Sequence, residues 1–208
     1  MPPDTGIETQ ARIIEAALKA VKTRGSAGAS ARTIAQIGGF NQASIYYHFG
    51  SLKALLLAAL DHSSNARMER YISALAAADT PEKVVEVGRH LFDEDVAQGH
   101  ITVLSELVAA CMAHPDLGPE VVRRLEPWVD LTQGLIDRFI KGSFLESYID
   151  TREAAQALIA FYMGIEMLYH LDHDAGRANR LFDMFSTFVP LVAPMLESTS
   201  TQEGDGHA

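Results

Sequence analysis

The helical spacing of apolar residues is the feature that most limits how this 208-residue chain can fold. The pattern is clearest in residues 7–24, where Ile7, Ile13, Ile14 and Leu18 recur at the interval expected of a helix. Alternation of apolar and polar residues, which would indicate strands, does not persist anywhere in the chain. The sequence therefore predicts an all-α protein of about nine helices.

Glycines and serines divide the first sixty residues into short helices. We expect helices over 7–24, 31–38 and about 42–48, followed by a fourth that begins at Leu52. Glycine ends each of the first three, and serine can cap two of the helices; the residues concerned are Gly25, Gly38, Gly39, Gly50, Ser30 and Ser51. The tight glycine-containing turn between the second and third helices is typical of a helix-turn-helix unit.

The remainder of the chain also has helical patterns. The expected helices cover 52–78, 81–98, 100–113, 117–142, 152–171 and 177–196. Pro127 should interrupt the helix in which it lies, and Pro190 and Pro194 should kink or fray the last one. The resulting organisation is a helix-turn-helix domain over 1–60 with its core in 7–55, a helical body over 61–196, and a polar tail over 197–208 that we expect to be disordered.

Charge is distributed unevenly along the chain. The formal net charge is −10, yet residues 1–60 carry six Lys or Arg and only three acids. A cationic first quarter on an acidic body indicates that only this quarter meets an anion. Neither a secretory signal nor an apolar run of membrane-spanning length is evident, and the single Cys111 fits a buried thiol, so we expect a cytoplasmic protein without a membrane partner.

The segment Phe40–Leu57, FNQASIYYHFGSLKALLL, concentrates hydrogen-bonding groups on one short helix. Ile45 and Phe49 share one face and can pack inward, which leaves the polar side chains outward. Such a helix suits the DNA major groove, where an amide reads adenine and a small residue such as Ala43 meets a thymine methyl group. Tyrosine, serine and histidine can donate to phosphate oxygens. The alternative is that these groups only cover a solvated surface.

From Ile13 to Leu60 the chain closely resembles the DNA-binding domain of the TetR (tetracycline repressor) family of bacterial transcriptional regulators. The matching strings are IIEAALKAVKTRG, ARTIAQIGG and ASIYYHFGSLKALLLAAL. The resemblance implies base-edge contacts from Asn41, Gln42 and Ala43, and DNA-backbone contacts from Arg32, Thr33, Ser44, Tyr46, Tyr47 and His48. The family often has Lys directly after the position of Ser51, whereas this chain has Leu52 and then Lys53. That shift rotates the side chain by about 100° around the helix, although Lys53 can still reach a phosphate.

The resemblance also implies an effector pocket in the body and a homodimer formed by the last two long helices. The candidate pocket residues are Leu104, Leu107, Val108, Cys111, Met112, Trp128, Phe139, Tyr162, Met163 and Met167. The candidate dimer residues are Ala157, Ala160, Gly164, Leu181, Phe185, Phe188 and Val192. Methionine and aromatic side chains suit an adaptable cavity, and the absence of Arg and Lys among them favours an apolar or aromatic effector. Alternatively, most of these residues simply form the core.

The sequence lacks the motifs of an enzyme. It contains no nucleophile elbow, no phosphate-binding glycine loop and no zinc-protease helix, so we expect no catalysis and no cofactor. The His170–Asp174 run and the stretch DEDVAQGH contain metal-ligand types, but the former falls at a helix end where His and Asp also serve as caps, and no metal is expected.

These observations predict a ligand-responsive regulator, most simply a repressor, that binds a palindromic operator in double-stranded DNA as a dimer and is released by its effector. An activator is equally compatible with the sequence, because the sign of regulation depends on operator position. The alternative from another class is a helical small-molecule carrier or enzyme that keeps the helix-turn-helix as a scaffold.

Overall fold

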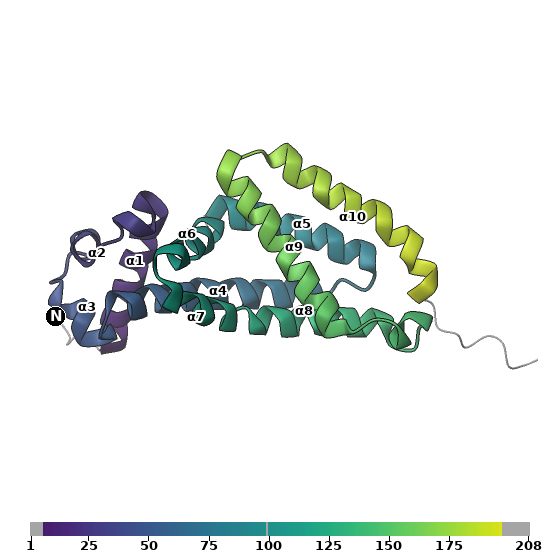
Figure 1. The fold of residues 1–208 in the computed structure, drawn as a ribbon, viewed down its shortest axis with the longest axis horizontal. Coiled ribbons are helices and arrows are strands. Elements are labelled where there is room, and N and C mark those ends of the chain that lie inside the picture. Colours follow the sequence, from purple (N-terminus) through teal and green to yellow (C-terminus); the bar gives the residue numbers. More distant parts are fainter. Residues whose placement is uncertain (1–5, 99, 197–208) are drawn as a thin grey trace, which may run out of the picture. The chain divides into compact units, whose positions relative to one another are not determined.

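The computed structural model of the chain describes residues 6–98 and 100–196 (Figure 1). These residues form ten α-helices and two 3-10 turns, with no strand among them, which confirms the all-α prediction. In chain order the elements are α1 (Gly6–Gly28), α2 (Ala31–Gly38), α3 (Ala43–Phe49), α4 (Leu52–Ala76), α5 (Pro81–Gln98), α6 (His100–Ala113), η1 (Pro115–Leu117), α7 (Gly118–Arg123), α8 (Glu126–Ile140), η2 (Phe144–Ser147), α9 (Thr151–Asp172) and α10 (Ala175–Leu196).

The largest departures from the expected helices concern α1 and the stretch 117–142. The regular helix of α1 breaks at Gly25 as expected, where φ is 69° and ψ is 172°, but a further helical turn follows as far as Gly28. The expected helix over 117–142 is divided into η1, α7 and α8, and Pro127 lies in the first turn of α8 instead of at the break. A missing N–H costs nothing in a first helical turn, so this proline begins a helix. Both Pro190 and Pro194 lie inside α10.

The chain forms two compact units that are discontinuous in sequence. Of the described residues, the amino-terminal unit contains 6–69, 95–98 and 100–124, and the carboxyl-terminal unit contains 70–94 and 125–196. The helix-turn-helix part lies entirely in the first unit. The expected division into domains over 1–60 and 61–196 stays a prediction about function, whereas the packing adds α6, η1 and α7 to the amino-terminal unit. The expected tail over 197–208 lies outside the described residues.

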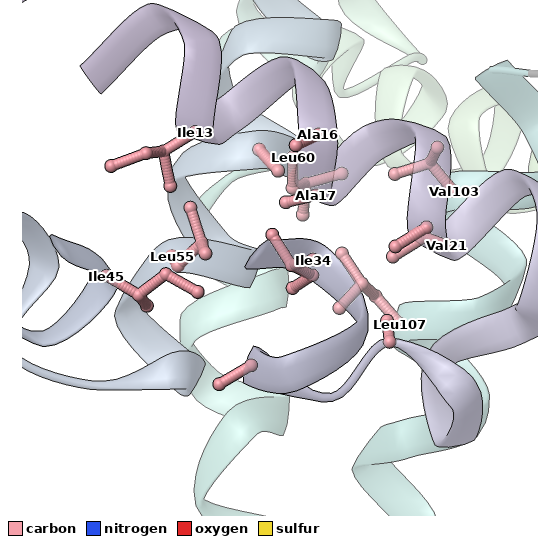
Figure 2. Packing of buried hydrophobic residues seen from close by; sticks show 14 of the residues in the cluster. Ile13, Ala16, Ala17, Val21, Ile34, Ile45, Leu55, Leu60, Val103 and Leu107 are labelled. Carbon is pink, nitrogen blue, oxygen red and sulfur yellow. The ribbon is translucent and has the colours of Figure 1, made fainter. Parts of the chain in front are cut away.

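One apolar core holds the amino-terminal unit together (Figure 2). Ile13 and Val21 of α1, Ile34 of α2, Ile45 of α3 and Leu55 of α4 are almost completely buried in it. The same core contains residues that come from much later in the chain, namely Val103, Leu107 and Val121. Phe49, Ile37 and Leu18 pack against this core, as the helical spacing predicts. The position of α3 therefore depends on side chains from both ends of a long stretch of sequence.

Aromatic contacts dominate the carboxyl-terminal unit. Tyr71 and Leu91 form a buried cluster with the half-buried Trp128, and the rings of Tyr71 and Trp128 meet edge to face at 5.1 Å between centroids. Phe92 contacts the rings of Tyr162 and Phe182 at centroid distances of 5.9 Å and 5.6 Å. α8 packs on α9, and α9 packs on α10.

Over residues 6–98 and 100–196, no single helix is long and apolar enough to cross a membrane. α3 and α4 meet the length and composition criteria only as a pair, and they are bent by 69° relative to each other. Ile45 and Leu55, one from each of these helices, are both buried in the core of the amino-terminal unit.

Candidate nucleic-acid interface

The turn between α2 and α3 is fixed by two adjacent glycines and a serine cap. The Ser30 hydroxyl accepts a hydrogen bond from the Thr33 amide at 3.2 Å, which caps α2 as predicted. Gly39 ends α2 in the left-handed conformation with a φ of 65°, which other L-residues adopt at a cost. A Cβ atom on Gly38 would lie 2.0 Å from the Phe40 ring and 3.0 Å from the Cβ of Ala16. The end of α2 therefore packs close to α1 and to Phe40 because Gly38 has no side chain.

α3 has one buried face and one open face. Ile45 is 0% exposed and anchors the helix in the core, whereas Tyr46 is 47% exposed and Tyr47 is 85% exposed. The remaining predicted contacts lie outward or half outward: Arg32, Asn41, Gln42 and Ala43 are exposed, and Thr33, Ser44 and His48 are intermediate. The rings of Tyr47 and His48 meet edge to face at 4.9 Å between centroids. The polar groups of α3 are thus available to a partner.

The two neighbouring amides, Asn41 and Gln42, have different environments. The Asn41 Oδ1 atom accepts a hydrogen bond of 2.8 Å from the Ala43 amide, so this side chain stabilises the start of α3. The Gln42 side chain makes no capping bond. A bidentate contact with adenine uses both the oxygen and the nitrogen of an amide. Gln42 therefore has the groups for base reading, and Asn41 must first give up its local bond.

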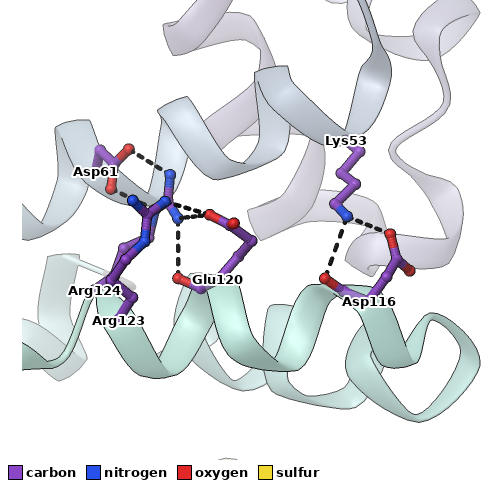
Figure 3. A network of polar contacts seen from close by, with 6 residues as sticks. All are labelled: Lys53, Asp61, Asp116, Glu120, Arg123 and Arg124. Atoms are coloured by element: carbon purple, nitrogen blue, oxygen red, sulfur yellow. Dashed lines mark hydrogen bonds and ion pairs between the residues drawn. The ribbon is translucent and has the colours of Figure 1, made fainter.

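Lys53, the predicted phosphate contact of α4, is engaged within the protein. Its ammonium group forms an ion pair with the carboxylate of Asp116 and donates to the Asp116 backbone carbonyl at 3.3 Å (Figure 3). The pair is accessible, with 38% of the Lys53 side chain and 66% of the Asp116 side chain exposed. The hydrogen bond from Lys53 holds the pKa of the Asp116 carboxyl below its ordinary value of 3.8.

The segment that carries Asp116 is tied to α4 at a second place. Arg124 donates to Asp61 on α4 at 2.6 Å and 3.1 Å, and to the Glu120 carboxylate at 2.9 Å (Figure 3). Leu117 and Val121, which lie between these polar links, are both 5% exposed. Sequence reasoning missed Asp116 because nothing near it identifies a partner 63 residues away in the chain.

Glu106 was missed for the same reason, and it links α6 to the end of α1. Its carboxylate accepts from the Ser26 amide at 2.7 Å and from the Ser26 hydroxyl at 2.9 Å. The only sequence signal is the unusual position of an acid within the apolar run of α6. This bond helps to attach α6 to the helices that hold α3.

The predicted pocket residues divide between the two units. In the amino-terminal unit Leu107 is buried in the core, Leu104 and Cys111 pack against that core, Val108 is half-buried, and Met112 is 87% exposed. The predicted pocket residues of the carboxyl-terminal unit are all half-buried: Trp128, Phe139, Tyr162, Met163 and Met167. The hydroxyl groups of Tyr162 and Tyr71 form a hydrogen bond of 2.6 Å. The pocket itself stays a prediction.

The predicted dimer residues lie on α9 and α10, largely on open surface. Ala157, Ala160, Gly164, Phe188 and Val192 are exposed, and Leu181 and Phe185 are half-buried. Further large apolar side chains are exposed on the same two helices, namely Leu158, Leu168, Leu171, Met184, Leu191 and Met195. Exposed apolar patches of this kind mark surfaces that meet another molecule.

The predicted cap role of the His170–Asp174 run is confirmed. His173 ends α9 in the left-handed conformation, and the Asp174 carboxylate accepts from the Arg177 amide at 3.0 Å at the start of α10. Asp172 and Asp174 also pair with Arg177 and Arg180. Among the described residues no three His, Cys, Asp or Glu side chains gather in a way that could hold a metal ion.

Comparison with known proteins matches this geometry to a family. Residues 13–59 match the model of the tetR family of bacterial regulatory proteins. The HTH-type transcriptional regulator TtgR of Pseudomonas putida is 26% identical over 164 residues, which cover 76% of this chain and 78% of TtgR.

Two solved structures share the fold. The multidrug binding protein EbrR, complexed with imidazole, is 23% identical with a TM-score of 0.64, and the match covers 88% of this chain and 96% of EbrR. The transcriptional regulator FadR of Bacillus subtilis, in complex with stearoyl-CoA, is 15% identical with a TM-score of 0.70, and the match covers 86% of this chain and 96% of FadR. The segment matched by the family model spans the helix-turn-helix and the start of α4, and over these residues the chain carries the amino-terminal domain of the tetR family of bacterial regulatory proteins.

Proposed function

We propose that this regulator binds a palindromic operator as a homodimer and that a small apolar or aromatic effector releases it. The observation that carries the proposal is the division of α3, where Ile45 is fully buried while Gln42, Tyr46 and Tyr47 face outward. In this proposal Gln42 and Ala43 meet base edges, and Asn41 joins them after leaving its local bond. The backbone contacts come from Arg32, Thr33, Ser44, Tyr46, Tyr47, His48 and Lys53.

Selection from a random duplex library tests the DNA-binding part. The wild-type protein should enrich a sequence with two related half-sites, spaced by roughly 34–36 Å or a multiple of that distance. Tyr46→Phe should then weaken binding to selected and mixed-sequence duplexes by a similar factor, because a phosphate contact carries no sequence information. A protein that enriches no sequence at low salt would contradict the proposal.

The dimer is proposed to form through the exposed apolar faces of α9 and α10. Phe188→Glu places a charge within that surface and should convert the protein to monomers in sedimentation velocity at micromolar concentration. Val122→Glu is the matched control, because Val122 is also an exposed apolar residue but lies on α7. A Phe188→Glu protein that remains dimeric would show that the dimer interface lies on another surface.

The effector is proposed to bind among the half-buried side chains of the carboxyl-terminal unit. Its aromatic and methionine side chains favour an apolar or aromatic compound. The EbrR and FadR structures contain imidazole and stearoyl-CoA, so this fold accepts chemically different ligands.

The chain has a single tryptophan, Trp128, which makes binding directly measurable. A compound that enters beside Tyr71 should change the emission of Trp128 and, at the same concentration, release the selected duplex. A helical carrier or enzyme would instead bind or convert its ligand with unchanged properties in Gln42→Ala and Tyr46→Phe variants, and it would not release DNA. Because binding to chromosomal DNA is the proposed activity, we place the protein in the cytoplasm.

A further inference from the structure

Permanent positive charge is scarce among the side chains proposed to contact DNA. Only Arg32 and Lys53 of that set are Arg or Lys residues, and the others are amides, hydroxyls, an alanine and a histidine. Neutralisation of phosphates by Lys and Arg supplies most of the sequence-independent affinity for DNA, and each neutralised phosphate requires a cation that is free to reach it. The state of Lys53 therefore has a large influence on how strongly each subunit binds.

Lys53 lies four residues after the end of α3, the helix proposed to contact base edges. α3 ends at Phe49, and Lys53 lies in the first turn of α4, where Ser51 caps the helix through the Ala54 amide at 3.0 Å. In the structure both the carboxylate and the backbone carbonyl of Asp116 hold the Lys53 ammonium group. Two oxygen atoms of η1 thus occupy a cation that a phosphate oxygen would otherwise take.

Asp116 is held in place by its neighbours. Leu117 is buried directly beside it, and Arg124 fixes the following turns to Asp61 on α4, two helical turns beyond Lys53 (Figure 3). The acid is therefore fixed opposite α4 and does not depend on a flexible loop to meet its partner. Both members of the pair remain partly exposed, so another anion can replace the carboxylate.

We propose that Asp116 competes with a DNA phosphate for Lys53 and thereby limits the affinity of this regulator for its operator. The proposal rests on the proposed function, and it adds a residue from the segment after α6 to the determinants of DNA binding. When DNA arrives, the Lys53 ammonium group exchanges a carboxylate for a phosphate. The net gain is then smaller than for a lysine that faces only water.

The test compares five purified full-length proteins, namely the wild type, Asp116→Asn, Glu120→Gln, Lys53→Met and the Lys53→Met, Asp116→Asn double variant. Each is measured in binding to two duplexes, one enriched by the wild type from a random library and one of mixed sequence. Asp116→Asn keeps the size of the side chain but removes its charge. We expect it to tighten binding to both duplexes by about two- to fivefold per subunit, the range that exposed ion pairs carry. The slope of log affinity against log salt should become steeper by about one unit per subunit.

Glu120→Gln is the matched control, because it removes one negative charge from the same segment. Glu120 pairs with Arg123 and Arg124 and not with Lys53. This variant should leave affinity near the wild-type value. In a Lys53→Met background, Asp116→Asn should not increase the affinity for DNA, because the ammonium group for which Asp116 and phosphate compete is absent. Circular dichroism melting should show that all variants remain folded, because the pair is exposed.

Three results would overturn the proposal: an Asp116→Asn protein that binds no more tightly than wild type, an equal gain in Glu120→Gln, or an equal gain in the Lys53→Met background. The latter two would assign the gain to general charge repulsion. Failure of the wild type to bind either duplex at low salt would instead overturn the proposed function. The two failures are therefore distinguishable in one set of titrations.

Discussion

Asn41 and Gln42 are adjacent amides, yet the structure gives them different roles. Gln42→Ala removes a candidate base contact from an exposed position, so it should relax preference at one base pair of each half-site by about 1–3 kcal/mol. The measurement is a competition of single-base variants of the selected duplex, with unchanged thermal stability as the control.

Asn41→Ala should act first on the fold. It removes the oxygen that accepts from the Ala43 amide, which should lower the free energy of unfolding by about 1 kcal/mol in urea titrations. Asn41→Asp keeps an acceptor and should restore most of that stability. A protein in which Asn41→Ala leaves stability unchanged would show that the local bond contributes nothing.

Individual residues also show what sequence could and could not reveal. The outward polar surface of α3 was predictable, because Ile45 and Phe49 occupy one face at helical spacing. The partner of Lys53 was not, because Asp116 lies 63 residues away and meets α4 only once the chain has folded. Similarly, the local bond of Asn41 depends on the position of the helix start, which is the least certain part of a sequence prediction.

The turn between α2 and α3 is the element most sensitive to added volume. Gly38→Ala would place a methyl group 2.0 Å from the Phe40 ring and 3.0 Å from the Cβ of Ala16, so Phe40 must move and α1 must shift slightly. We expect a loss of about 1–3 kcal/mol of stability, together with weaker DNA binding.

Gly134→Ala is the matched control for that substitution. Gly134 lies within α8, and an added Cβ would meet no atom within 4 Å. This variant should be slightly more stable than wild type, because alanine favours helix over glycine. Equal melting temperatures for the two alanine variants would contradict the tight packing of the turn.

α7 and α8 show why helix boundaries were harder to predict than helix content. Proline is compatible with both a break and a first helical turn, so Pro127 alone does not locate the interruption. The break falls at Arg124 and Leu125, and Arg124 is held there by its bonds to Asp61 and Glu120. The contact between Arg124 and Asp61 is tertiary, and no local pattern encodes it.

Over the whole molecule, acid should destabilise the fold through its paired carboxylates. Hydrogen bonds and ion pairs lower the pKa of Asp79, Asp116, Glu120 and Asp174 below the ordinary values of 3.8 for Asp and 4.5 for Glu. A folded-state pKa below the unfolded value gives stability that is complete above the unfolded value and is lost as the pH falls through the folded one.

The urea midpoint should therefore fall as the pH is lowered from about 5 to about 3, a window below that in which histidines titrate. One molar salt should reduce this dependence because the pairs are exposed. An Asp79→Asn protein, which loses the pair with Lys83, should show a shallower fall. A midpoint that is independent of pH throughout this window would contradict the role of these pairs.

The core of the amino-terminal unit predicts that its helix-turn-helix cannot be isolated. A fragment ending at residue 69 lacks Val103, Leu107 and Val121, and burial of such side chains is worth about 1.5–3 kcal/mol each. The combined loss approaches the total stability of a typical domain. We expect the fragment to melt without a cooperative transition in circular dichroism, and the full chain to melt cooperatively.

A milder variant separates this effect from the truncation itself. Leu107→Ala in the full chain should lower the free energy of unfolding by about 2–5 kcal/mol and weaken DNA binding, although Leu107 lies far along the chain from α3. A fragment that melts as cooperatively as the full chain would show that 95–124 is dispensable.

The discontinuous core also sets an order of events at the ribosome. Val121 must leave the exit tunnel before the first helices can close their interior, so more than half of the chain is synthesised while that interior is still open. A nascent regulator cannot engage the chromosome early. For the same reason, joining this DNA-binding unit to a different effector-binding domain requires two separate stretches of the gene to be moved together.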